Sequence, residues 1–319
     1  PRVIRAQLGD NQKQNLHRAI AEALAQKRRS MNAAEVAGHF EAAGDAEKAY
    51  PLYVKAARGA ARQRLFGEVL DLTAKSLSVD DGDDSRESIR ILRRWVYLLR
   101  GEALLARGLW TEAIAPLKAA VGAARREHDQ NALARCLAAL GRSIYRQGRF
   151  DDAAPLLEES LSHAGQGSPE RAAATRALAD IKLRDGRTAE SESLWLAALD
   201  IAMTVQSTDG EARARRGLAH TKAIQGRLQE ASQLLGQADD LLGDTGDARV
   251  RAGILARLIE LDNAGGRYTS AVRNAEILVD LVRRRELSER LPWAYALLAE
   301  ALVATGEPAE AEDAVQQSL

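Results

Sequence analysis

Arginine side chains recur at helical spacings through the middle of the sequence, and they are the residues best suited to bind something. A guanidinium group is planar, stays charged at neutral pH and can hold a carboxylate or a phosphate through two parallel hydrogen bonds. A tyrosine, a histidine and two carboxylates lie among these arginines and offer an anchor or a means of orienting a ligand. The set that we expect to bind a partner comprises Arg135, Arg142, Tyr145, Arg146, Arg176, Asp180, Arg184, Arg213, Arg216, His220, Arg257 and Glu260.

The chemistry of these side chains predicts a protein or peptide partner that is acidic, or a ligand that bears a carboxylate. A nucleic-acid interface built from the same arginines is the alternative. The 45 basic and 45 acidic residues leave no net charge, and the set holds few aromatic residues, so both observations argue against nucleic acid. A chain this rich in arginine also places several on any exposed face, and that explanation stays open.

No group of residues predicts catalysis, a cofactor or a metal. The sequence has no G-x-x-x-x-G-K-[ST] phosphate loop, so ATP binding is not expected. The five histidines lack the H-E-x-x-H spacing of a zinc site. The one cysteine, Cys136, has no base nearby in the sequence and is expected to be a small core residue. We therefore predict that the protein is not an enzyme.

Composition also bears on location. Cys136 cannot form an internal disulfide, which is typical of a reducing compartment. No apolar stretch reaches the length of a membrane-spanning helix, and Pro1–Asp10 does not resemble a secretion signal. These features predict a cytoplasmic protein that has no membrane partner.

The elements that position the arginines follow from a repeated glycine. In a series of seven glycines, each precedes an Ala or a Ser by five residues, and the last six glycines of the series lie 40, 38, 40, 40 and 40 residues apart. A fixed interval of this size indicates a solenoid of stacked helix-turn-helix units with a period of about 40 residues. The pairs are Gly44/Ala49, Gly108/Ala113, Gly148/Ala153, Gly186/Ser191, Gly226/Ala231, Gly266/Ala271 and Gly306/Ala311.

Each unit is expected to be a helix, a tight turn and a second helix. Apolar residues at spacings of three and four precede each glycine, and a second apolar stripe follows it, as at Ala153 and Leu157. The glycine supplies the left-handed residue that ends the first helix, and Asp45, Thr111 or Asp151 is expected to cap the second. The first helix of each unit should line the concave side, which places the arginines there.

This pattern resembles the tetratricopeptide repeat. The family places Leu and then Gly or Ala seven residues before the turn glycine, and this chain does so at Leu140-Gly141, Leu178-Ala179, Leu218-Ala219 and Leu298-Ala299. The resemblance runs from about Ser30 to the end and implies an all-α, right-handed superhelical solenoid. Two features depart from the family: the longer period, and the polar residues Lys182, Lys222 and Asp262 where a large apolar residue is usual.

The amino-terminal region resembles another family. Leu16-His17-Arg18, the run from Ala34 to Phe40, and Ala43-Gly44-Asp45 look like the junction that follows the nucleotide-binding and winged-helix modules of bacterial signal-transduction ATPases of the STAND class. The resemblance implies that the chain is the sensor or scaffold arm of such a regulator. It also implies that upstream ATPase and winged-helix modules of the same full-length chain are among its partners.

These observations predict three regions. Residues 1–29 form a helical adaptor that ends an upstream module, residues 30–85 form irregular helical repeats, and residues 86–319 form six tetratricopeptide-like repeats. Within the second region the sequence predicts a long helix over Asp45–Leu65 and a shorter one that ends at Ser78.

Overall fold

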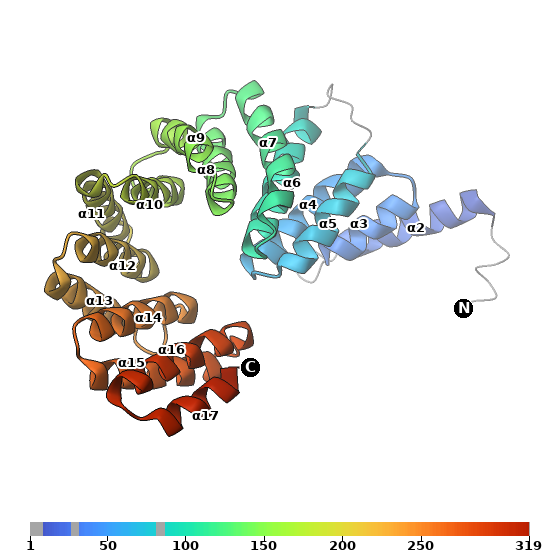
Figure 1. Ribbon diagram of the computed structural model, residues 1–319. Coiled ribbons are helices and arrows are strands. Elements are labelled where there is room, and N and C mark those ends of the chain that lie inside the picture. Colours follow the sequence, from blue (N-terminus) through green and yellow to red (C-terminus); the bar gives the residue numbers. More distant parts are fainter. Residues whose placement is uncertain (1–8, 27–31, 81–86, 319) are drawn as a thin grey trace. The chain divides into compact units, whose positions relative to one another are not determined.

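The computed structural model describes residues 9–26, 32–80 and 87–318, and every regular element in these ranges is a helix (Figure 1). The chain divides into two compact units, Pro1–Ala164 and Gly165–Leu319. The first unit contains α2 (Asp10–Gln26), α3 (Ala33–Ala42), α4 (Ala46–Arg62), α5 (Phe66–Ser78), α6 (Glu87–Ala106), α7 (Trp110–Arg126), α8 (Gln130–Arg146) and α9 (Phe150–His163).

The second unit has the same kind of helices. It contains α10 (Pro169–Arg184), α11 (Thr188–Thr204), α12 (Thr208–Ile224), α13 (Leu228–Leu242), α14 (Ala248–Ala264), α15 (Tyr268–Arg284), the 3-10 helix η1 (Ser288–Arg290), α16 (Leu291–Thr305) and α17 (Pro308–Ser318). Consecutive helices pack on one another in both units. The predicted all-α class and the helix-turn-helix repeat are confirmed.

The turn glycines have the predicted left-handed conformation. At Gly148, where φ is 78°, the Gly148 N–H donates to the carbonyl of Tyr145 at 2.9 Å and the Arg149 N–H donates to that of Ile144 at 3.3 Å. These bonds satisfy carbonyl groups at the end of α8 that have no partner inside the helix. A helix can therefore end and its successor begin within three residues.

The predicted caps are correct for one helix and wrong for two. Asp45 caps α4, because its side chain accepts from the Lys48 N–H at 3.2 Å. Thr111 and Asp151 lie inside α7 and α9, which begin without a side-chain cap. In these two turns one residue, Leu109 or Arg149, separates the glycine from the next helix. The capping position is therefore Leu109 or Arg149, and the predicted residues lie two positions further along.

Left-handed residues other than glycine close several other turns. His128 and Gln206 precede α8 and α12, both with φ of 53°. Arg64, with φ of 61°, lies between α4 and α5. The helices α4 and α5 match the long helix predicted over Asp45–Leu65 and the shorter one predicted to end at Ser78. Sequence reasoning looked only for glycine, so it did not find that α4 and α5 form a pair of the same kind.

We call the first helix of each pair its leading helix. The helix α4 follows the turn at Gly44 and precedes the turn at Arg64, and we count it as a leading helix because it contacts α6. In the second unit, the leading helices α10, α12, α14 and α16 contact one another in order, and in the first unit α4, α6 and α8 do so. Contacts between successive second helices, such as α11 and α13, are at most marginal in the described residues. The leading helices of each unit therefore form a shared wall, here called its leading wall, on the side where the helices lie closer together.

Small residues allow the helices of a pair to approach. Ala153 and Ala231 are completely buried, as the repeated spacing predicts. Gly141 on α8 faces Leu157 on α9 so closely that an added Cβ would lie 2.8 Å from the leucine Cγ. Ser191 occupies the same position as the alanines, and its hydroxyl lies 3.1 Å from that of Thr221 on α12.

Two buried polar residues at positions that are usually apolar have polar partners that reach them from the surface. The Lys222 ammonium on α12 is 7% exposed and pairs with Glu192 on α11. Asp262 on α14 is 5% exposed, accepts from Arg267 Nε at 2.8 Å and accepts from Asn274 Nδ2 at 3.0 Å. At both sites a polar contact between neighbouring helices stands where the repeat usually has an apolar contact.

The predicted region boundaries near residues 29 and 85 fall in ranges outside the described residues, so the three regions stay a prediction. Within the described helices, none combines the length and the apolar character needed to cross a bilayer.

Candidate functional site

On the leading wall of the second unit, two of the predicted residues bridge adjacent leading helices. Arg213 on α12 donates to Asp247, the capping residue of α14, at 2.9 Å. Arg216, one turn further along α12, lays its guanidinium group against Gly253 of α14, where any side chain would displace it. Both arginines therefore lie on the wall, as predicted, and Arg213 is already neutralised by a carboxylate.

The next turn of α12 brings a histidine into this cluster. Burial lowers the pKa of His220, and the positive charges of Arg257 and Arg216 lower it further, while Glu260 opposes them. Arg257 and Glu260 on α14 pair with each other at 2.5 Å. The structure thus brings together Arg216, His220, Arg257 and Glu260, and their charges act on one another.

The lowered pKa of His220 predicts a pH dependence of stability. A histidine whose pKa is lower in the folded than in the unfolded state stabilises the fold above its unfolded pKa, about 6.5, and this contribution is lost as the pH falls through the folded value. We expect the free energy of unfolding of His220→Gln to fall less than that of the wild type between about pH 7.5 and about pH 5.5. Urea titrations across this range measure it, and parallel curves for the two proteins would contradict it.

The predicted residues of α10 have different exposures. Arg176 and Asp180 are half-buried, whereas Arg184, two turns beyond Arg176, is exposed at the end of the helix. The spacings of four and eight residues place the three on one face of α10.

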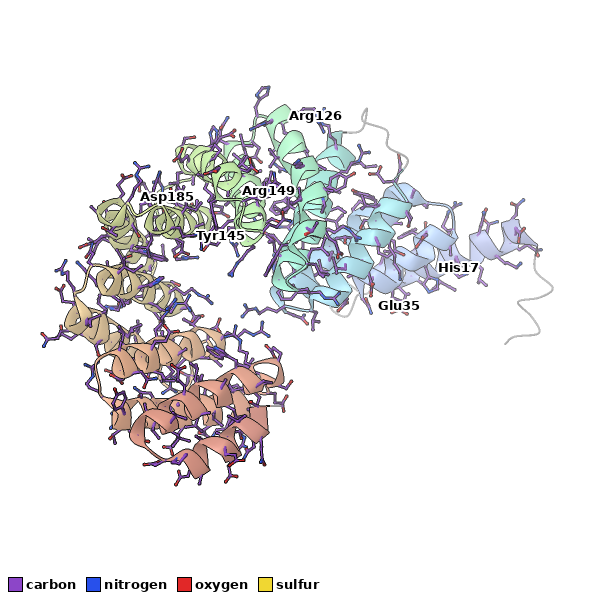
Figure 2. The ribbon with its side chains drawn as sticks, in the orientation of Figure 1. His17, Glu35, Arg126, Tyr145, Arg149 and Asp185 are labelled. Carbon is purple, nitrogen blue, oxygen red and sulfur yellow. The ribbon has the colours of Figure 1, made fainter. Side chains whose placement is uncertain are left out.

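In the first unit, the predicted residues of α8 separate into two groups. Arg135 is held by Glu102 of α6 through two hydrogen bonds of 2.8 and 3.0 Å. Arg142 and Arg146 are exposed. Tyr145 packs edge-on against Phe150, with 5.5 Å between ring centroids, at the carboxyl end of α8 (Figure 2). The ring of Tyr145 therefore packs at the turn into α9. It is half-exposed, so only part of it can contact a ligand.

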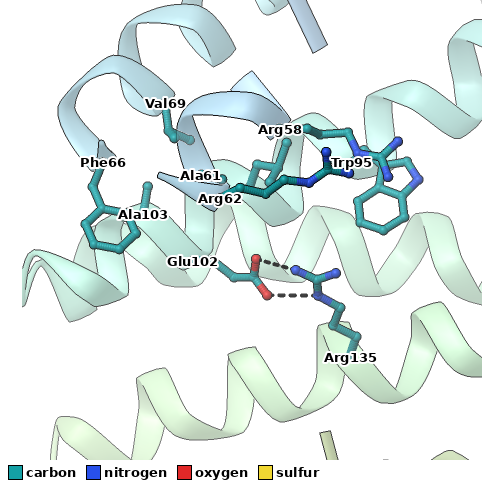
Figure 3. A pocket seen from close by; sticks show the side chains of 10 residues that line it. Arg58, Ala61, Arg62, Phe66, Val69, Trp95, Glu102, Ala103 and Arg135 are labelled. Carbon is teal, nitrogen blue, oxygen red and sulfur yellow. Dashed lines mark hydrogen bonds and ion pairs between the residues drawn. The ribbon is translucent and has the colours of Figure 1, made fainter. Parts of the chain in front are cut away.

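Sequence reasoning missed a pocket on the leading wall of the first unit (Figure 3). The pocket has a volume of 340 Å³ and lies among α4, the start of α5, α6 and α8. Three arginines and one glutamate line it together with apolar side chains: Arg58, Arg62, Arg135 and Glu102, with Ala61, Phe66, Val69, Trp95, Leu99 and Ala103. The four-residue spacing of Arg58 and Arg62 indicates that both lie on one face of a helix. That spacing points to the pocket only if α4 is known to be a leading helix.

Cys136 is not part of a site. It is completely buried in α8, and burial raises the pKa of its thiol to about 12. A thiol with such a pKa stays protonated near neutral pH and is a poor nucleophile. The expectation that Cys136 is a core residue is confirmed.

Comparisons with known proteins agree with this architecture. Two family models, both described as tetratricopeptide repeat, match residues 92–165, 170–242 and 292–317, which together are more than half of the chain. No curated protein sequence matches it.

Several solved structures are similar over nearly the whole chain. The apo form of the quorum sensor NprR from B. thuringiensis has 15% identity and a TM-score of 0.69, covering 99% of this chain and 89% of its own. A Rap protein complexed with Competence and Sporulation Factor has 15% identity and a TM-score of 0.68, covering 96% and 89%. A STAND signal-transduction ATPase with a tetratricopeptide repeat sensor, from Pyrococcus horikoshii, has 12% identity and a TM-score of 0.63, covering 97% of this chain and 46% of its own. At these identities the similarity shows the fold.

Proposed function

The chain belongs to the tetratricopeptide-repeat family, and on that premise we propose that it is a non-catalytic scaffold whose leading walls bind an acidic segment of a partner protein. The observation that carries this proposal is that each unit, taken by itself, places cations on its leading helices. Arg142 on α8 and Arg184 on α10 are exposed, and Arg216 on α12 reaches across to α14. Several guanidinium groups along the wall of one unit suit a chain of carboxylates better than a single small ligand.

The solved structures with the same fold support a sensing role. These proteins include a quorum sensor, a Rap protein complexed with Competence and Sporulation Factor, and a signal-transduction ATPase with a tetratricopeptide repeat sensor. We propose that this chain has a comparable place in a bacterial, cytoplasmic signalling regulator, in which occupancy of the leading walls is transmitted to modules upstream of Pro1. The resemblance of residues 16–45 to the STAND junction supports the same assignment.

Charge reversal on the leading helices tests the proposal. The probes are a synthetic peptide rich in Asp and Glu and its counterpart with Asn and Gln, followed by fluorescence anisotropy. We expect the wild type to prefer the acidic peptide and the variant Arg142→Glu/Arg184→Glu/Arg216→Glu to bind it at least about tenfold more weakly, because three attractive charges become repulsive.

A matched control reverses three exposed charges on second helices. Lys118 and Arg126 lie on α7 and Arg273 on α15. The variant Lys118→Glu/Arg126→Glu/Arg273→Glu has the same net charge as the first and should keep the affinity of the wild type. Equal losses in both variants would mean that binding follows net charge alone and would overturn the proposal. Tight binding of a bare oligonucleotide that weakens steeply with salt would favour the nucleic-acid alternative.

A further inference from the structure

The pocket of the first unit combines an apolar floor with a surplus of positive charge. Val69, Leu99 and Ala103 are buried and form part of the floor, and Phe66 lies beside them. A volume of 340 Å³ is within the range of natural ligand sites and admits a large side chain. Among the residues that line it, three guanidinium groups face one carboxylate.

The glutamate neutralises only one of the three arginines. Glu102 is engaged by Arg135 through both of its oxygens. Arg58 and Arg62 form no ion pair within the part of the chain that the structure describes. Among the residues that line the pocket, two positive charges are therefore not neutralised by its carboxylate, and they lie beside an apolar floor.

When no ligand is bound, the two positive charges of Arg58 and Arg62 destabilise α4. Arg58 and Arg62 are four residues apart on α4, so they lie on one face of the helix, where like charges repel. Arg62 is in the last turn of α4, where the helix dipole favours a cation. That explanation does not extend to Arg58, which lies a full turn further from the helix end.

Trp95 holds two of the guanidinium groups in place. The Arg58 guanidinium carbon lies 4.9 Å from the centroid of the indole, and that of Arg135 lies 5.3 Å from it. Figure 3 shows Arg58 and Arg62 extending from α4 toward Trp95. The cation–π contact orders Arg58 before any ligand arrives, so less of its side-chain entropy is lost on binding.

We propose that this pocket binds an acidic peptide through one large aliphatic side chain, which rests on the apolar floor, and through flanking carboxylates, which pair with Arg58 and Arg62. The indole is covered by the guanidinium groups, so the apolar contact falls to Phe66, Val69 and Leu99. The inference rests on the proposed function and names the ligand chemistry of a site separate from Arg142, Arg184 and Arg216.

The test uses a labelled peptide with a leucine between two pairs of Asp or Glu residues. Two companion peptides replace the leucine by alanine or the acids by their amides. Arg58→Gln/Arg62→Gln should weaken binding of the parent peptide at least about tenfold, because charge-assisted hydrogen bonds are lost. Ala61→Leu, which fills the pocket and changes no charge, should weaken it by a similar factor and should abolish the preference for leucine over alanine.

Two controls separate this effect from misfolding and from net charge. Arg58→Gln/Arg62→Gln should leave the melting temperature close to that of the wild type, because the repulsion that is removed offsets the lost contact of Arg58 with Trp95 and the lost dipole interaction of Arg62. Lys118→Gln/Arg126→Gln on α7 removes the same charge away from the leading wall and should bind as the wild type does.

The outcomes distinguish this inference from the broader proposal. If the parent peptide binds the wild type and both pocket variants equally, but not Arg142→Glu/Arg184→Glu/Arg216→Glu, the pocket assignment is wrong and the proposed function stands. If neither acidic peptide binds the wild type, both are wrong. Loss in the arginine variant with unchanged binding to Ala61→Leu would also overturn the pocket assignment, because the apolar contact would then be absent.

Discussion

Arg94→Met is expected to lower the free energy of unfolding of the first unit by roughly 3–5 kcal/mol, the range found when one partner of a buried ion pair is removed. The Arg94 side chain is 5% exposed on α6 and contacts Glu127 at 3.1 Å and Asp129 at 2.7 Å. These two carboxylates flank the turn that joins α7 to α8. Removing the arginine leaves Glu127, which is 7% exposed, as a buried negative charge without its main partner.

The pKa of Glu127 leads us to expect that the stability loss in Arg94→Met depends on pH. Burial raises that pKa, and the positive charge of Arg94 opposes the shift. Without Arg94 the carboxyl group should take up a proton more readily, so the deficit of Arg94→Met should shrink as the pH falls. Urea titrations at neutral and mildly acidic pH measure this change.

A double variant is the control. Arg94→Met/Glu127→Gln removes both charges, and we expect it to recover most of the lost stability. If the double variant is as unstable as Arg94→Met, the loss comes from packing and not from the uncompensated carboxylate.

Gly217→Ala is expected to destabilise the second unit by about 1–3 kcal/mol, the usual effect of overpacking a core. Gly217 lies inside α12, where alanine is normally the better helix former. Here an added Cβ would overlap the indole of Trp195 on α11, closer than carbon atoms can approach. Trp195 is 4% exposed, so it cannot move aside without opening the core.

Gly236→Ala on α13 is the matched control. An added Cβ at Gly236 meets nothing within 4 Å, and the change should stabilise by roughly 0.5–1 kcal/mol through the lower entropy of the unfolded chain. Thermal unfolding of both variants should therefore shift the melting temperature in opposite directions. A higher melting temperature in both variants would show that the Trp195 indole can move aside at little cost and would contradict the prediction.

The periodic part of the fold was predictable because each turn needs the same local chemistry. A glycine with positive φ and a small residue five positions later can be read directly from a sequence, as at Gly148 and Ala153. The pair α4 and α5 escaped because Arg64 adopts the left-handed conformation without being glycine. The Arg64 N–H donates to the carbonyl of Ala61 at 3.1 Å and the Leu65 N–H donates to that of Ala60 at 3.0 Å, so this turn is held by the same bonds as the glycine turns.

The candidate sites were predictable to a lesser extent. Helical spacing placed Arg213 and Arg216 on the leading wall, but it could not show that Asp247 neutralises the first of them. That contact joins residues 34 positions apart. The pocket beside Trp95 depends on side chains from four helices, so no single stretch of sequence contains its pattern.

The way the helices begin has a consequence for synthesis on the ribosome. The leading helices α8, α10, α12 and α14 each have an Asp or Ser whose side chain accepts from their first amides, whereas α9, α11, α13 and α15 have none. A leading helix therefore has its first turn stabilised by its own residues as it leaves the ribosome. Its companion lacks this local stabilisation and depends more on packing, so we expect each pair to form around its leading helix.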